Sequence, residues 1–209
     1  MKVVDVVQGF LGSGKTTLIN HLLQEVFTLE KTLVLQTEWG EAAINDYGHR
    51  VILRNWDWEK GFTLLEMRKL LQLPGVERII IELNGMAPAD ELLSTLGIMG
   101  SRGEIKLGNC IAVFHGPTWE VMGKPLEEIF QQMVLSSQGF WIREGTPELH
   151  RWIQSFQPKA CLTTGGNWQL WYTQIDRAKR QNLTINLVKL SLMVLGMYLF
   201  YWFIIKKLT

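Results

Sequence analysis

The sequence has little cysteine and almost no net charge. Only Cys110 and Cys161 occur among 209 residues, far apart and each within an apolar run. Two isolated thiols argue against a disulfide framework or a cysteine-rich zinc site, and they favour buried side chains in a reducing compartment. A formal net charge of +1 gives no basic footprint for nucleic acid, so we expect no nucleic-acid partner.

Signals for export, repetition and disorder are missing as well. The chain enters a β-branched run at residues 2–7 at once, which predicts that no signal peptide precedes it. We see no internal repeat or low-complexity tract, and the scatter of the nine tryptophans favours packing over a stacking platform. With 47% hydrophobic and 20% charged residues, we expect a sizeable core in one domain of ordinary size, plus an appendage.

One motif is complete. Residues 9–16 read G-x-x-x-x-G-K-T, the phosphate-binding loop of P-loop nucleotidases. The run at 2–7 predicts a buried strand before this loop, and apolar residues at helical spacing over 18–26 predict a helix after it. The alternative is a chance glycine turn before a helix, which the agreement of motif and flanks disfavours.

The residue types in this loop suit phosphate. Glycines let backbone N–H groups turn around phosphate oxygens, Lys15 can reach the β- and γ-phosphates, and the Thr16 hydroxyl can ligate Mg²⁺. We expect the loop residues that bind the nucleotide to be Gly9, Gly12, Ser13, Gly14, Lys15, Thr16 and Thr17.

A carboxylate follows a strongly apolar run. Residues 78–81 are typical of a central parallel strand, and Glu82 comes directly after them, with Gly85 three residues later. An acidic residue at the end of such a strand can reach Mg²⁺ or its waters, so we expect Thr16 and Glu82 to be the metal ligands. The alternative is a carboxylate that is exposed to solvent at the strand end.

Strand and helix patterns alternate along the chain. This alternation predicts an α/β fold with a mostly parallel sheet flanked by helices. Further strands are expected at 32–36, 51–53, 110–114, 140–142 and 160–164, and helices from Thr63, over 90–96, from Pro125 and after Thr146.

Three segments together resemble the CobW/HypB/UreG family of P-loop GTPases, and the CobW type most. Residues 9–23 are similar to the first motif of that family, and Glu38-Trp-Gly-Glu41 resembles its Glu-Phe-Gly-Glu switch segment. Residues 82–85, Glu-Leu-Asn-Gly, resemble its Glu-x-x-Gly segment. The resemblance covers roughly residues 1–165, fades after about residue 120, and implies a P-loop NTPase fold.

The resemblance also implies an activity. It implies binding of GTP with Mg²⁺, slow hydrolysis and service to metal centres or metal cofactors, with ATP not excluded. It makes Glu38, Glu41 and Glu82 the candidate catalytic residues and adds Gly85 to the nucleotide site. Glu38 and Glu41 would sense the γ-phosphate or position water.

Two family motifs are absent. No Cys-x-Cys-Cys precedes Thr63, so the soft ligands that select zinc are missing, and carboxylates near residues 38–49 favour solvent or Mg²⁺ over a transition metal. In place of Asn-Lys-x-Asp, whose Asp reads guanine, the chain has Arg143-Glu-Gly-Thr146. We therefore expect a weaker preference for GTP over ATP than a typical GTPase shows.

The tail differs from the rest. Residues 187–205 are nearly all apolar, and as a helix they would span about 28 Å, close to the hydrocarbon thickness of a bilayer. We expect a nucleotide-binding domain at 1–175, a basic linker at 176–186 and a transmembrane helix at 187–205. A buried core helix is the alternative, but no further domain is left to cover it.

Two functions remain open from the sequence. The first is a membrane-tethered, single-pass nucleotidase with its domain in the cytoplasm, which assists a membrane-protein or metalloprotein client. The second is a regulatory subunit that binds nucleotide without significant turnover and gates a membrane partner such as a permease.

Overall fold

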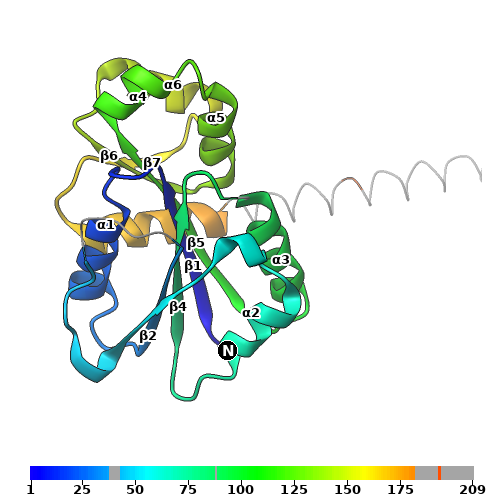
Figure 1. Cartoon of the computed structure of the whole chain (residues 1–209). Helices are drawn as coiled ribbons and strands as arrows, with labels where there is room; N and C mark the ends of the chain where they lie inside the picture. The colour runs from blue at the N-terminus through cyan, green and yellow to red at the C-terminus, as the bar shows by residue number, and fades with distance from the viewer. Residues whose placement is uncertain (38–42, 88, 182–192, 194–209) are drawn as a thin grey trace, which may run out of the picture.

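The computed structural model describes residues 1–37, 43–87, 89–181 and 193. Its core is a seven-stranded sheet in the order β3-β2-β4-β1-β5-β6-β7, and every neighbouring pair is parallel. This confirms the predicted α/β class with a parallel sheet (Figure 1). The strands are β1 (Val3–Gly9), β2 (Thr32–Gln36), β3 (Val51–Asn55), β4 (Arg78–Asn84), β5 (Lys106–His115), β6 (Gly139–Arg143) and β7 (Cys161–Thr163).

Helices join the strands. They are α1 (Lys15–His21), which continues as η1 (Leu22–Val26), η2 (Gly48–Arg50), η3 (Trp58–Lys60), α2 (Leu64–Leu71), α3 (Ala89–Ser101), α4 (Gly116–Met122), α5 (Glu127–Ser136) and α6 (Pro147–Phe156). A last helix occupies residues 168–181. The helices predicted from Thr63 and after Thr146 are confirmed, and both threonines act as N-caps, since their hydroxyls accept from the backbone N–H three residues on. The prediction for Pro125 is wrong, because α5 begins two residues later, after a turn at 123–126.

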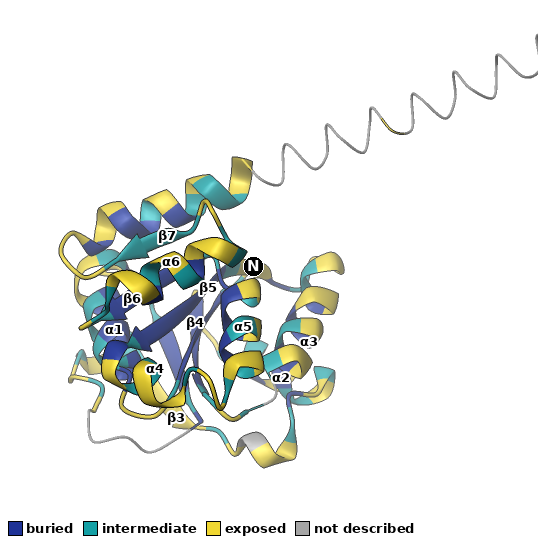
Figure 2. Cartoon of the chain, turned by 90° about the horizontal axis from the view of Figure 1, so that it is seen from above, coloured by how far each residue is buried: buried dark blue, intermediate teal, exposed yellow. Residues whose placement is uncertain are grey.

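Strand residues alternate between two apolar layers. On β4, Ile79 and Ile81 pack with α2 and α3, whereas Ile80 packs on the opposite face with α1 and the helix at 168–181. A third cluster lies where α5 and α6 cover β5 and β6. Burial on both faces explains the continuous apolar runs of the central strands (Figure 2).

The helix at 168–181 packs on the same face of the sheet as α1. Its first residue, Trp168, stacks on His21 of α1 with ring centroids 4.8 Å apart. The predicted linker at 176–186 is therefore helical as far as residue 181. The predicted membrane helix at 187–205 lies outside the described residues, apart from Met193, and no helix within the described ranges has the length and apolar character to cross a bilayer.

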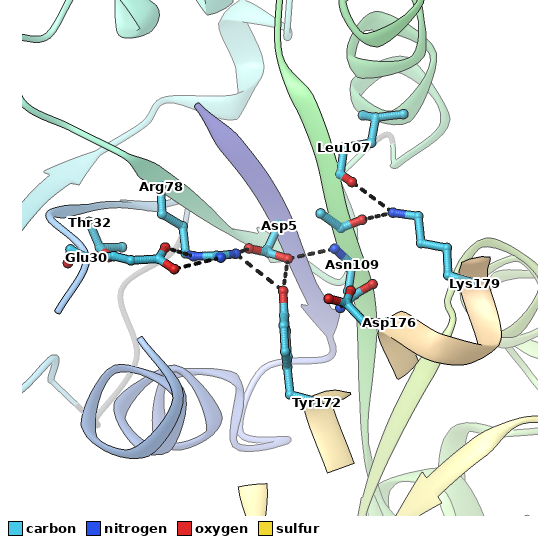
Figure 3. A network of polar contacts seen from close by, with 10 residues as sticks. Asp5, Glu30, Thr32, Arg78, Leu107, Asn109, Tyr172, Asp176 and Lys179 are labelled. Carbon is cyan, nitrogen blue, oxygen red and sulfur yellow. Dashed lines mark hydrogen bonds and ion pairs between the residues drawn. The ribbon is translucent and has the colours of Figure 1, made fainter. Parts of the chain in front are cut away.

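A buried polar network holds this helix at the N-terminal end of the strands (Figure 3). The Asp5 carboxylate on β1 is 1% exposed and accepts hydrogen bonds from Arg78, from the Tyr172 hydroxyl at 2.7 Å and from the Asn109 backbone at 2.6 Å. Arg78 also pairs with Glu30. Through Tyr172, the network joins the last helix to β1, β4 and β5.

Candidate functional site

The predicted phosphate loop connects β1 to α1. Gly9 has φ 154°, and a Cβ there would lie 2.6 Å from the carbonyl oxygen of Val113, so no side chain fits. Gly12 and Gly14 also have positive φ, at 75° and 107°. Gly14 is the N-cap of α1, so the loop fills the space between the C-terminal end of β1 and the start of α1.

Two polar side chains are buried in this loop. Lys15 is 3% exposed, and its ammonium donates to the carbonyl oxygens of Gly9 at 2.8 Å and Phe10 at 3.1 Å. Ser13 is 2% exposed, and its hydroxyl has no hydrogen-bond partner among the residues that the structure describes. The Ser13 hydroxyl lies against Gly9, 2.7 Å from where a Cβ of that glycine would be. A buried hydroxyl without a partner is costly unless a ligand satisfies it.

Glu82 reaches the loop from the end of β4. Its carboxylate is 2% exposed and accepts from the Thr16 hydroxyl at 2.5 Å, although the two residues are 66 apart in sequence. Gln36, at the end of β2, donates to the second oxygen at 2.7 Å. Sequence reasoning missed Gln36; the signal was a polar residue ending an apolar strand. A hydroxyl beside a carboxylate is a donor set that suits Mg²⁺.

The other predicted site residues lie in different places. Gly85 packs on the loop, since a Cβ there would lie 2.8 Å from the Cα of Phe10. Thr17 is half-buried on α1. Glu38 and Glu41 lie outside the described residues and stay predictions. In the part of the chain that the structure describes, no three His, Cys, Asp or Glu residues gather in a group that could hold a metal ion.

The segment after β6 faces the same loop. The Arg143 guanidinium donates from Nη1 to the carbonyl oxygen of Ser13 at 3.3 Å. Glu144 points to His115 instead, with Nε2 and Oε2 3.8 Å apart, and the Thr146 hydroxyl accepts from the backbone of Leu149. Sequence reasoning found this segment only as a missing base-reading motif, and it missed the contact of Arg143 with the loop.

A parallel sheet, a glycine loop that opens a helix, and a carboxylate at the adjacent strand end define a P-loop NTPase fold. Residues 3–49 match the family model described as the CobW/HypB/UreG nucleotide-binding domain. A comparison with curated proteins gave no significant match.

Solved structures agree on the fold. The Zn(II)-bound YjiA GTPase from E. coli matches with a TM-score of 0.60 and 22% identity, over 79% of this chain and 58% of that one. The hydrogenase maturation factor HypB from Archaeoglobus fulgidus matches with a TM-score of 0.59 and 14% identity, over 85% and 90% of the two chains. This chain thus spans less than two thirds of the YjiA chain.

Proposed function

We propose that the chain is a CobW-like GTP-binding protein that holds a Mg²⁺–nucleoside triphosphate and hydrolyses it slowly. The observation that carries this proposal is the contact between Thr16 in the phosphate loop and the buried Glu82 carboxylate. The family match over residues 3–49 supports the assignment to GTP, and ATP remains a competing ligand.

Each side chain has a defined task in this proposal. Lys15 leaves the loop carbonyls to bind phosphate oxygens, and the Ser13 hydroxyl donates to one of them. Thr16 and Glu82 would hold Mg²⁺, and the bound ion would neutralise phosphate charge. Gln36 fixes the Glu82 carboxylate. Glu38 and Glu41 sense the γ-phosphate or position the attacking water.

The finer parts of the function concern clients and location. The names of the similar structures, a Zn(II)-bound GTPase and a hydrogenase maturation factor, support a role beside a metalloprotein or metal cofactor. The apolar residues 187–205 support a membrane tether, with the nucleotide domain in the cytoplasm, where nucleotide is supplied. Sedimentation of the full-length chain with membranes at physiological salt tests the tether, and recovery in the supernatant without detergent would exclude it.

Binding is tested by calorimetry on the full-length chain with Mg²⁺–GTP and Mg²⁺–ATP. Lys15→Ala removes a charge-assisted contact worth about 1.5–3 kcal/mol, so affinity should fall at least tenfold. Lys124→Ala, an exposed lysine after α4, is the matched control and should bind like wild type. Equal binding by wild type and Lys15→Ala would contradict the proposal.

Turnover separates the nucleotidase from a regulatory subunit without significant hydrolysis. We expect slow, Mg²⁺-dependent release of phosphate by wild type and a lower rate for Glu82→Gln. If wild type binds nucleotide but releases no phosphate above background, the regulatory alternative is the better description.

A further inference from the structure

Arg143 lies against the phosphate loop on the side away from Glu82. Besides the bond from its guanidinium to Ser13, it crowds Gly14, where an added Cβ would lie 2.7 Å from Nη1 and 2.8 Å from Cδ. The ring of Trp141, two residues earlier on β6, supports it with its centroid 5.6 Å from Cζ. The loop and β6 thus hold the guanidinium beside the residues that would cradle phosphate.

The guanidinium has no carboxylate partner within the described residues. Its hydrogen bond goes to a neutral carbonyl, and the neighbouring Glu144 turns toward His115. Within the same loop the buried Ser13 hydroxyl is also without a partner in the described ranges. A half-buried cation and an unsatisfied buried donor that face one loop favour an anion between them.

The positions of Arg143 and Glu82 in the sheet indicate that the bound anion is extended. Glu82 ends β4 and Arg143 ends β6, and in the sheet β4 and β6 lie on opposite sides of the adjacent pair β1 and β5. The Thr16–Glu82 pair therefore marks one end of the site and Arg143 the other. An extended polyphosphate fits this arrangement better than a single phosphate ion.

The same segment offers little to read a base. The Glu144 carboxylate is directed at His115, and the Thr146 hydroxyl accepts from the backbone as the cap of α6. Glu144 thus contacts His115 on β5 and not the phosphate loop, and the Thr146 hydroxyl is engaged at the start of α6. Arg143 carries only donors, which suit phosphate oxygens of any nucleotide.

We propose that Arg143 binds the phosphate chain at the end opposite Glu82, and that the site takes nucleoside triphosphates with little discrimination between bases. This inference rests on the proposed function of the same site. In this proposal, Arg143 at the end of β6 provides part of the binding affinity through the phosphates, and the nucleoside contributes little to it.

Calorimetry with Mg²⁺ complexes of GTP, ATP and CTP on the full-length chain tests this inference. Wild type should bind the three within about tenfold of one another. Arg143→Met keeps the apolar stem over Trp141 but removes the charge, and it should weaken all three by about tenfold, because a charge-assisted contact is lost. Arg143→Lys should recover part of that loss. Arg151→Met removes an exposed arginine on α6 and should leave the affinities unchanged.

These measurements distinguish a failure of the proposed function from a failure of the proposed Arg143 contact. No binding by wild type would reject the proposed function itself. Binding by wild type with unchanged affinities in Arg143→Met would reject the phosphate contact alone. A preference of wild type for GTP of one hundredfold or more, or a loss in Arg143→Met confined to one nucleotide, would show that the base is read and would overturn the inference. Thermal unfolding of each variant checks that it is folded.

Discussion

The two ends of β1 use buried polar groups in opposite ways. At the N-terminal end, Asp5 is surrounded by donors, and Arg78 lies between Asp5 and Glu30. At the C-terminal end, among the described residues, the Ser13 hydroxyl has no partner and Arg143 donates to a carbonyl oxygen and has no carboxylate partner. One strand therefore carries a charge network closed within the chain at one end and a site open to a ligand at the other.

The network around Asp5, at the closed N-terminal end of β1, stabilises the fold. The Arg78 guanidinium lies over the ring of Phe27 at 3.8 Å, so its remaining face is covered by an aromatic side chain. One amide oxygen in the network, Asn109 Oδ1, lacks a partner within the described ranges. The charges of Asp5, Arg78 and Glu30 each have an oppositely charged neighbour. Buried ions are tolerated when paired in this way, and removing one member leaves the others uncompensated.

Comparing the two ends of β1 indicates which buried polar groups belong to a ligand site. Both ends hold a buried cation near a β1 residue, so burial and charge alone do not mark a site. Both ends also leave one buried polar atom without a partner among the described residues, Asn109 Oδ1 and the Ser13 hydroxyl. What distinguishes the loop is that its unsatisfied group is a donor and lies near an arginine that has no carboxylate partner among the described residues, so an anionic ligand can satisfy both. Substitutions at the closed end should lower stability, whereas substitutions at the open end should lower affinity.

The largest expected effect is on stability, at Arg78. Arg78→Met leaves the Asp5 charge buried without its cation, and the free energy of unfolding should fall by about 3–5 kcal/mol. Urea unfolding of the full-length chain measures it. Arg151→Met, whose side chain is 72% exposed, should stay within about 0.5 kcal/mol of wild type.

A second substitution tests whether the loss of stability comes from the unpaired Asp5 charge. If the cost at Arg78 comes from the stranded Asp5 charge, then Asp5→Asn combined with Arg78→Met should cost less than the sum of the two single changes. A loss below about 1 kcal/mol for Arg78→Met alone would show that the network is not what holds this end of the sheet.

The two ends also differ in what the sequence could predict. The open end was predictable because the loop is a contiguous motif with a chemical meaning, and because Glu82 follows an apolar strand. The match over residues 3–49 and the contact of Glu82 with Thr16 agree with that reading. The caps at Thr63 and Thr146 were predictable for the same reason, since their partners lie three residues away.

The closed end could not be predicted because its partners are distant in sequence. Asp5 and Arg78 are 73 residues apart, and Asp5 and Tyr172 are 167 apart, so only the sheet order brings them together. The available signal was an aspartate inside a run of valines, which implies a buried charge and hence a partner. The contact of Arg143 with Ser13, across 130 residues, was hidden in the same way.

A smaller effect is expected at Tyr172, and it should depend on pH. Tyr172→Phe removes one of the donors to Asp5 and should cost about 1 kcal/mol at neutral pH. Burial, and then the nearby Asp5 carboxylate, raise the pKa of Tyr172 above its ordinary value of 10.0. The unfolded chain therefore releases this proton first, so the contribution of Tyr172 is present below pH 10 and is lost as pH rises above it.

The pH dependence can be isolated by difference. Unfolding free energies of wild type and Tyr172→Phe, measured between neutral pH and pH 11, should converge above about pH 10, because only wild type loses this contribution. A constant difference across the range would mean that the hydroxyl of Tyr172 titrates alike in both states.

The smallest effect on stability is expected at Ser13. Here the two ends of β1 can be compared directly, because Ser13→Ala, like Tyr172→Phe, removes one buried hydroxyl. The Ser13 hydroxyl has no partner in the part of the chain that the structure describes, so the free energy of unfolding of the ligand-free protein should stay within about 0.5 kcal/mol of wild type or rise slightly. The affinity for Mg²⁺–GTP should fall by about threefold to tenfold, because a hydrogen bond to phosphate is lost. Urea unfolding without nucleotide and calorimetry with it give the two numbers on one preparation. If Ser13→Ala lowers stability as Tyr172→Phe does and leaves affinity unchanged, the two ends of β1 do not differ in the way described, and the unpartnered hydroxyl is part of the fold.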